Sequence, residues 1–179
     1  MEKERYFEYI NNSMGLMHIE MLLVGNAQGL GILDVELIEE FPKLKINSQL
    51  EEDRLKKLRH ITLSELWVMG AYELIRFINE RLPKPTDIFS EGSIEKIKGT
   101  KRIFEEVRVP LVKFQKRHEK RLFSGVVQPN FDSIKGMGWK IHLMEKAGIE
   151  TKIIYRKDLG DLFLELLKEI NNNVLESVQ

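Results

Sequence analysis

Apolar residues recur at intervals of three and four between residues 51 and 82, a spacing that predicts one long amphipathic helix. The helix is expected to stop before Pro83 and Pro85, because proline cannot continue the backbone hydrogen-bond ladder. A Thr-x-x-Glu pattern beginning at Thr62 also fits a helix start, so a break near this residue stays open. The apolar positions trace one stripe, made up of Leu55, Leu58, Ile61 or Thr62, Leu66, Met69, Tyr72 or Glu73, Ile75 and Ile78 or Asn79.

The two ends of the chain carry further helical patterns. Between residues 6 and 24 the apolar positions again follow steps of three and four, but residues 17–24 also alternate as a strand would. Helix and strand therefore both stay open for residues 16–24. Residues 158–172 predict a closing helix with Asp158 as its N-cap. Its buried face is expected to hold Leu159, Leu162, Phe163, Leu166, Leu167 and Ile170.

Two short runs at residues 138–144 and 151–156 are rich in β-branched and aromatic side chains, which favour strands. Gly148 between them suits a turn, so a β-hairpin is expected at about residues 138–156. A two-stranded hairpin is not stable by itself and should pack on helices or gain another strand. Trp139 at its start is expected to lie in the core.

These patterns predict a mainly α protein of the α+β class, a helical bundle-like domain with a C-terminal hairpin and a closing helix. A chain of 179 residues has the length of one domain, here residues 1–179. The helical body is expected to span residues 1–122, and the hairpin with the last helix to span residues 123–179.

A second long helix is expected from Ser93 to about Leu122, with a kink or break at Pro110. Apolar residues such as Phe104 and Val107 fall along one side, so the basic residues form a face of their own. This basic face is the candidate binding surface. It consists of Arg102, Lys113, Lys116, Arg117 and Lys120, with Arg108 and Arg121 beside it.

The charges are unevenly distributed along the chain, although 28 basic and 28 acidic residues cancel to a net charge of zero. Residues 96–121 carry ten basic and three acidic side chains, whereas eight of the ten charged residues in 1–40 are acidic. This asymmetry favours an anionic partner for the basic segment, either nucleic acid or an acidic protein. The alternatives are packing of the acidic N-terminal segment near the basic helix, or a solvated helix face.

His118 lies on the apolar side of the expected basic helix. One interpretation makes it a buried, hydrogen-bonded core residue. The other makes it a catalytic residue in a cleft opened at Pro110, with Arg108 and Arg121 beside it.

The leading hypothesis is a small cytoplasmic binding or regulatory module that engages an anionic partner. Neither a metal nor a cofactor is implied, because the four His residues lack ligand spacing and the chain has no cysteine. No apolar run is long enough to span a bilayer, and the lack of cysteine fits a reducing compartment. A homodimer is also expected from the apolar load of the long helices and the free hairpin edges.

Residues 21–41, MLLVGNAQGLGILDVELIEEF, combine an apolar run, a Gly-x-x-x-Gly-x-Gly pattern and a helix. Gly25, Gly29 and Gly31 resemble the phosphate-binding loop of short-chain dehydrogenases, in which glycines let backbone N–H groups approach a pyrophosphate. The resemblance implies a nucleotide-binding protein that uses a loop at residues 25–31. The resemblance does not extend beyond this segment, because no Tyr-x-x-x-Lys pair follows. The alternative is that the glycines belong to a connection between two helices.

Arg54 and His60 have five residues between them, a spacing similar to the Arg-x(4–6)-His signature of HEPN-type helical ribonucleases. This resemblance implies that the protein cleaves RNA through attack by a 2′-hydroxyl group. Arg54 and His60 would then be catalytic residues on the same helix. Leu55 departs from the family pattern, which usually places a polar residue after the arginine. Binding module, ribonuclease and nucleotide-binding protein therefore remain as three hypotheses.

Overall fold

The computed structural model describes residues 2–112, 117–118, 121–145 and 148–177, with side-chain detail for residues 3–111, 127–142 and 151–177. The helical elements are α1 (Glu2–Ser13), the 3-10 helix η1 (Met14–His18), α2 (Leu22–Glu40), the 3-10 helix η2 (Phe41–Lys43), α3 (Glu51–Arg81), α4 (Glu91–Val112) and α5 (Arg156–Ser177). The strands are β1 (Arg117–His118), β2 (Arg121–Asp132), β3 (Gly136–Glu145) and β4 (Gly148–Tyr155).

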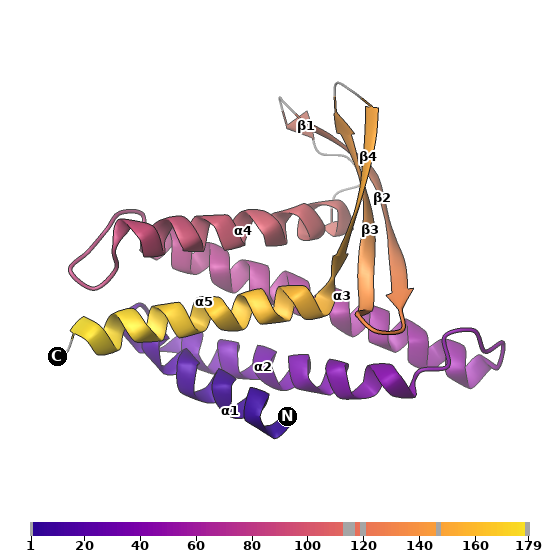
Figure 1. Cartoon of the computed structure of the whole chain (residues 1–179), viewed down its shortest axis with the longest axis horizontal. Coiled ribbons are helices and arrows are strands. Elements are labelled where there is room, and N and C mark those ends of the chain that lie inside the picture. The colour runs from indigo at the N-terminus through magenta and orange to yellow at the C-terminus, as the bar shows by residue number, and fades with distance from the viewer. Residues whose placement is uncertain (1, 113–116, 119–120, 146–147, 178–179) are drawn as a thin grey trace.

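The helices form one packed body around α3, which contacts α2 on one side and α4 on the other, while α5 packs against α1 and α4 (Figure 1). Trp67, Phe104 and Phe163 bring α3, α4 and α5 together, with ring centroids 6.0 to 6.4 Å apart. All three rings are fully buried. Such edge and tilted ring contacts stabilise a core beyond the area that they bury.

The strands form an antiparallel sheet in the order β1-β2-β3-β4, which projects from the helical body (Figure 1). One face of the sheet places Trp139, Ile141 and Ile154 in the core. The register between β2 and β3 shifts between Ser124 and Gln128, as at a β-bulge. The sheet joins the helices through β2 and β3, which contact α4, and through β3 and β4, which contact α5.

The mainly α architecture with a C-terminal hairpin and a closing helix is confirmed. The expected hairpin corresponds to β3 and β4, and it gains β2 as a third long strand. Trp139 is fully buried, as expected. The closing helix begins at Arg156, two residues before the predicted N-cap Asp158.

The predicted helix from Ser93 to about Leu122 is confirmed as far as Val112 and is wrong at its C-terminal end. It ends as α4 at Val112, shortly after Pro110, and residues 117–118 and 121–132 are strands. Proline removes one backbone donor near the helix end, and pairing with β3 supplies the hydrogen bonds of the following segment. Local periodicity could not reveal this pairing, because the partner strand lies further along the chain.

The glycines at residues 25–31 lie inside α2, so the predicted nucleotide-binding loop is wrong. Residues 14–18 and 22–40 are helical, which settles the open choice near residues 16–24 in favour of helix. Gly31 is required where α2 crosses α1, because a Cβ there would come within 2.4 Å of the Tyr9 ring.

Three acidic residues near the N-terminus pair with partners outside the basic segment 96–121. Glu8 pairs with Lys168, Glu20 with Arg81, and Glu40 with Arg59. These contacts do not support the expectation that the acidic segment packs against the basic one.

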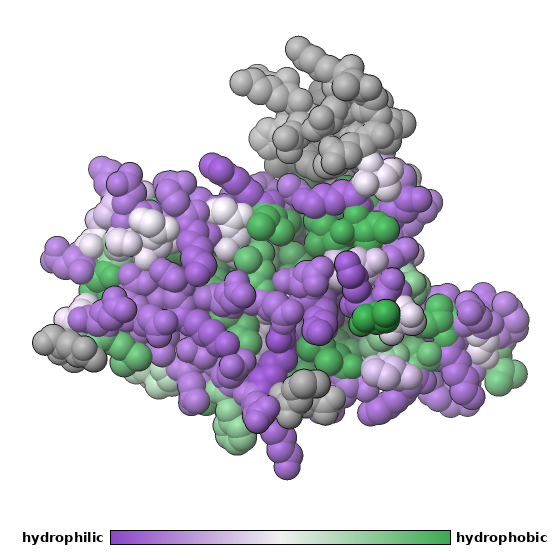
Figure 2. Space-filling model, viewed as in Figure 1, coloured by the Kyte–Doolittle hydropathy of each residue, from purple (hydrophilic) through white to green (hydrophobic). Residues whose placement is uncertain are grey.

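The side of the molecule that carries α4 and α5 is covered mostly by hydrophilic residues, with apolar patches near the base of the sheet (Figure 2). Among the helices of the described ranges, none combines the length and apolar composition needed to cross a bilayer.

Candidate functional site

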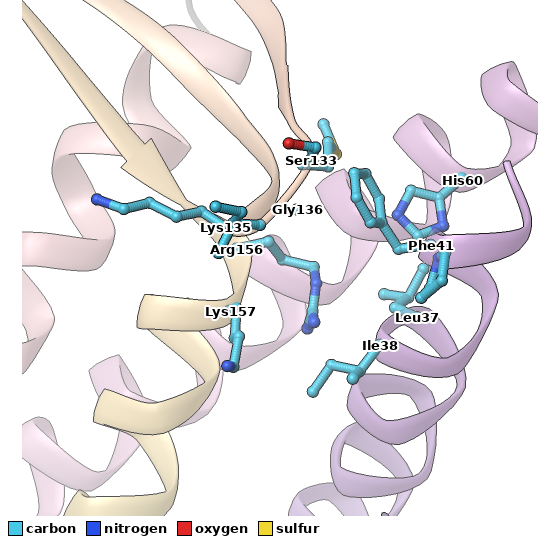
Figure 3. Close-up of a pocket in the computed structure, with 12 residues that line it drawn as sticks. Leu37, Ile38, Phe41, His60, Ser133, Lys135, Gly136, Arg156 and Lys157 are labelled. Carbon is cyan, nitrogen blue, oxygen red and sulfur yellow. The ribbon is translucent and has the colours of Figure 1, made fainter. Parts of the chain in front are cut away.

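A pocket of about 160 Å³ lies where the β2–β3 turn and the start of α5 meet the end of α2 and the middle of α3 (Figure 3). Its apolar wall comes mainly from Leu37, Ile38, Phe41, Pro42 and Met137. Its polar lining comes from His60, Ser133, Lys135, Arg156 and Lys157. No carboxylate is among the described residues that line it.

The β2–β3 turn that closes one side of the pocket is held by Asp132. Its Oδ1 accepts hydrogen bonds from the backbone N–H groups of Ile134 at 2.9 Å and Lys135 at 2.8 Å. These bonds to Lys135 and Ile134 lower the pKa of the Asp132 carboxyl group. Gly136 follows with a φ of +87°, which favours glycine over any residue with a side chain.

Arg156, the first residue of α5, is 3% exposed and forms a buried ion pair with Asp34 of α2. Asp34 is fully buried and also accepts hydrogen bonds from Arg5 Nε at 2.6 Å and Tyr9 Oη at 3.1 Å. The Arg156 guanidinium also lies over the Trp67 ring, 5.6 Å from its centroid. These contacts fix the position of Arg156 at the pocket, since a buried charge is stable only when it is paired.

The Arg5, Asp34 and Arg156 cluster contains two cations and one fully buried carboxylate. Burial lowers the pKa of Arg5, but the combined effect of Asp34, Tyr9 and the hydrogen bond to Asp161 raises it above its ordinary value. Arg5 has a second carboxylate partner, Asp161 at 2.6 Å, whose side chain is 45% exposed. Asp34 and Asp161 together balance the charges of Arg5 and Arg156, and of these four residues only Arg156 lines the pocket.

Gly160 allows α5 to approach this cluster. A Cβ at Gly160 would lie 2.6 Å from Asp34 Oδ1 and 2.9 Å from Arg5 Nη2. Its carbonyl oxygen also accepts a hydrogen bond from Tyr9 Oη at 3.1 Å. The close packing of α1, α2 and α5 around Asp34 therefore depends on the absence of a side chain at Gly160.

His60 lines the pocket from α3 and is 1% exposed. Its ring packs against Phe41 with centroids 5.8 Å apart, and its Nδ1 atom has no hydrogen-bond partner among the described residues. Burial, and next the charge of Arg156, lower the pKa of His60 to about 4. The imidazole is therefore neutral near pH 7, with one ring nitrogen available to an incoming ligand.

The two lysines at the pocket differ in direction. Lys135 extends away from the cavity (Figure 3), and its Nζ lies 5.1 Å from the centroid of the Tyr155 ring. Lys157 is exposed beside Arg156 at the edge of the cavity. Arg156, Lys157 and His60 are thus the polar groups best placed to meet an anion.

The predicted ribonuclease pair is not brought together. Arg54 and His60 are both on α3, but six positions along an α-helix turn them about 120° apart. Arg54 is exposed in a separate depression with Leu55 and Leu58, whereas His60 is buried at the pocket. The third catalytic candidate, His118, is on β1 instead of a helix, and its side chain lies outside the described detail.

The predicted basic helix face is not a single helical surface. Arg102 is exposed on α4, while Arg108 turns inward to Glu73 at 3.2 Å and over the Tyr72 ring. Arg117 and Arg121 lie on β1 and β2. Lys113, Lys116 and Lys120 lie outside the described residues.

The sequence pointed to His60 as a candidate site residue, but it did not point to Asp34 or Arg156. One signal was available, because Asp34 falls on the same side of its helix as Leu23, Ala27 and Leu37, which are all buried. A carboxylate on an apolar helix face predicts a buried partner of opposite charge. The partner itself, 122 positions away, had no local signal.

Comparisons of the chain with protein-family models, with curated protein sequences and with solved structures gave no match. Candidate functions therefore rest on the pocket and the charges around it.

Proposed function

We propose that this protein is a small binding module for an anionic ligand, and that the pocket between His60 and Arg156 receives a phosphate-sized anionic group. The observation that carries the proposal is a buried Arg156 beside a buried His60 with an unpartnered Nδ1, at a cavity with no carboxylate in its described lining. A bound anion would accept charge-assisted hydrogen bonds from Arg156 and Lys157 and pair with the imidazole.

The size of the cavity supports a small anionic group over a whole organic ligand. Its volume of about 160 Å³ lies below the roughly 300–1,000 Å³ typical of pockets that enclose drug-sized molecules. The guanidinium of Arg156 and the ammonium of Lys157 come from α5 and the imidazole of His60 comes from α3, which suits a tetrahedral phosphate that accepts several hydrogen bonds.

We favour nucleic acid, which would present its phosphate groups, as the partner over an acidic protein. Arg117 and Arg121 lie on β1 and β2, at the end of the sheet remote from the β2–β3 turn (Figure 1). A phosphodiester chain offers repeated charges to separate basic positions.

The lack of cysteine is consistent with the cytoplasmic location that we propose, which cell fractionation would test.

The central experiment measures thermal stabilisation and calorimetric binding with sulfate and inorganic phosphate, against chloride at equal ionic strength. Wild type is expected to be stabilised by sulfate and phosphate beyond the effect of chloride. Lys157→Glu should weaken binding by about tenfold, and the matched control Lys84→Glu, exposed in the loop after α3, should not. Equal stabilisation by all three salts, or equal binding in both variants, would rule out the pocket.

A pH series with sulfate isolates the role of His60. A bound anion favours the imidazolium form, so sulfate affinity should increase as the pH falls from 7 toward 5. His60→Gln should remove this dependence. Affinity that does not vary with pH in wild type would exclude His60 from the site.

Short single-stranded RNA and DNA form the second arm, titrated at several salt concentrations. If nucleic acid binds and Lys157→Glu weakens it, the pocket contacts the phosphate chain. If nucleic acid binds equally well to that variant, the contact lies elsewhere and the pocket has no part in it.

A further inference from the structure

The outer face of α3 carries an apolar stripe that the described chain leaves exposed. Leu55, Leu58 and Leu66 are 60%, 59% and 51% exposed. They point away from the side of α3 on which Trp67 and Ile75 are fully buried. Part of the apolar stripe predicted from the sequence therefore faces solvent instead of the core. Exposed apolar patches of this kind mark interaction sites.

The stripe borders a groove of about 870 Å³ between α2 and α3. Gly25 and Gly29 line the α2 side, and a Cβ at either position would meet no atom within 4 Å. Leu22, also on this side, is 77% exposed. The groove therefore has room for side chains of another helix, with apolar groups at its edge.

The spacing along α3 fits a second copy of the same helix. Leu55, Leu66 and the half-buried Phe77 follow at intervals of eleven residues, which turn through about 1,100°, close to three full turns, and so stay on one line. In an antiparallel pair with a two-fold axis at Leu66, that residue meets its own copy and Leu55 meets Phe77 of the second copy.

Several of the charges beside the stripe are paired within the same chain. Glu73 pairs with Arg76, Glu20 with Arg81, and Glu40 with Arg59. The whole chain has a net charge of zero. This surface therefore neither selects a strongly charged partner nor repels a second copy of itself.

We propose that this face, made of the outer sides of α2 and α3, binds a second copy of the chain with the α3 helices antiparallel about Leu66. The stripe from Leu55 to Phe77 is about 33 Å long at 1.5 Å per residue. The axis of α2 lies about 8–10 Å to one side, so the face is two helices, or about 20 Å, wide. Its footprint is therefore on the order of 600–700 Å². This approaches the roughly 800 Å² per partner of a standard specific interface.

The first test compares oligomeric state by sedimentation for wild type, Leu66→Glu and Leu175→Glu. Leu175 is 54% exposed on α5 and provides a matched control away from the stripe. Wild type and Leu175→Glu are expected to be dimers. Leu66→Glu should weaken association by about 100-fold or more, because both copies bring a carboxylate to the axis. Circular dichroism checks that the variant is folded.

The second test uses the absence of natural cysteine in the chain. Oxidation of Leu66→Cys should give a covalent dimer in high yield, because the two sulfurs meet at the axis, whereas Leu175→Cys should not. A wild-type protein that stays monomeric at its highest soluble concentration overturns the proposal. So does a dimer that persists in Leu66→Glu, since its interface must lie elsewhere.

Discussion

Asp34 and Arg156, which are 122 positions apart in the chain, form a buried ion pair that connects α2 to the first residue of α5. The pair joins the helical body to the sheet, because Arg156 directly follows β4. It also positions Arg156 at the pocket. Stability and the candidate site therefore depend on the same contact.

Removal of the carboxylate from this pair should be strongly destabilising. Asp34→Asn leaves Arg156 buried without its counter-charge and is expected to cost about 3–5 kcal/mol of unfolding free energy. Urea denaturation measures the change. The exposed pair of Glu52 and Lys56 provides the comparison, since Glu52→Gln should cost less than about 1 kcal/mol. Similar losses in the two variants would contradict the assigned role of Asp34.

Gly160 should not tolerate even a methyl group. Gly160→Ala places a carbon 2.6 Å from Asp34 Oδ1, and the resulting displacement of α5 is expected to cost about 1–3 kcal/mol. Gly99 on α4 has no atom within 4 Å of a Cβ, so Gly99→Ala should stabilise the protein by up to about 1 kcal/mol. Thermal unfolding of the two variants should shift in opposite directions.

His60 should make the protein less stable in acid. Its pKa is about 4 in the folded chain against an ordinary value of 6.5, because the ring is buried and lies near Arg156. The unfolded chain therefore binds this proton first, and stability is lost as the pH falls from about 6.5 to 4, by up to about 3 kcal/mol.

Urea midpoints at several pH values check the effect of His60. His60→Gln should flatten this part of the pH profile, while His18→Gln, at an exposed position, should follow wild type. A parallel profile for His60→Gln would show that the histidine is protonated equally in both states.

The two tryptophans should respond differently to replacement by phenylalanine. Trp67 Nε1 donates a hydrogen bond to the carbonyl oxygen of Leu30 at 2.9 Å, whereas buried Trp139 Nε1 has no partner among the described residues. Both variants leave a cavity, but only Trp67→Phe also removes a hydrogen bond, although the Leu30 carbonyl keeps its partner within α2. It should cost about 1 kcal/mol more than Trp139→Phe in chemical denaturation. The opposite order would show that Trp139 has a partner.

The sequence by itself determined those elements whose signals are local. The helix at residues 51–81 follows from its apolar spacing and the prolines after it, and the hairpin follows from two β-rich runs around Gly148. His60 was also singled out from the sequence, although for a different partner. Each of these features depends on residues that are neighbours along the chain or one helical turn apart.

Tertiary structure alone decided the rest. Residues 121–132 became a strand because β3 pairs with them, and α2 runs through its glycines because Gly31 meets Tyr9 in the core. Apolar periodicity could not say which face of α3 would be buried, since both faces carry apolar residues. The pocket also required His60 and Arg156 to meet across the fold. The free energy gained by burying a residue depends on neighbours that are distant in the chain, and a local sequence pattern does not contain them.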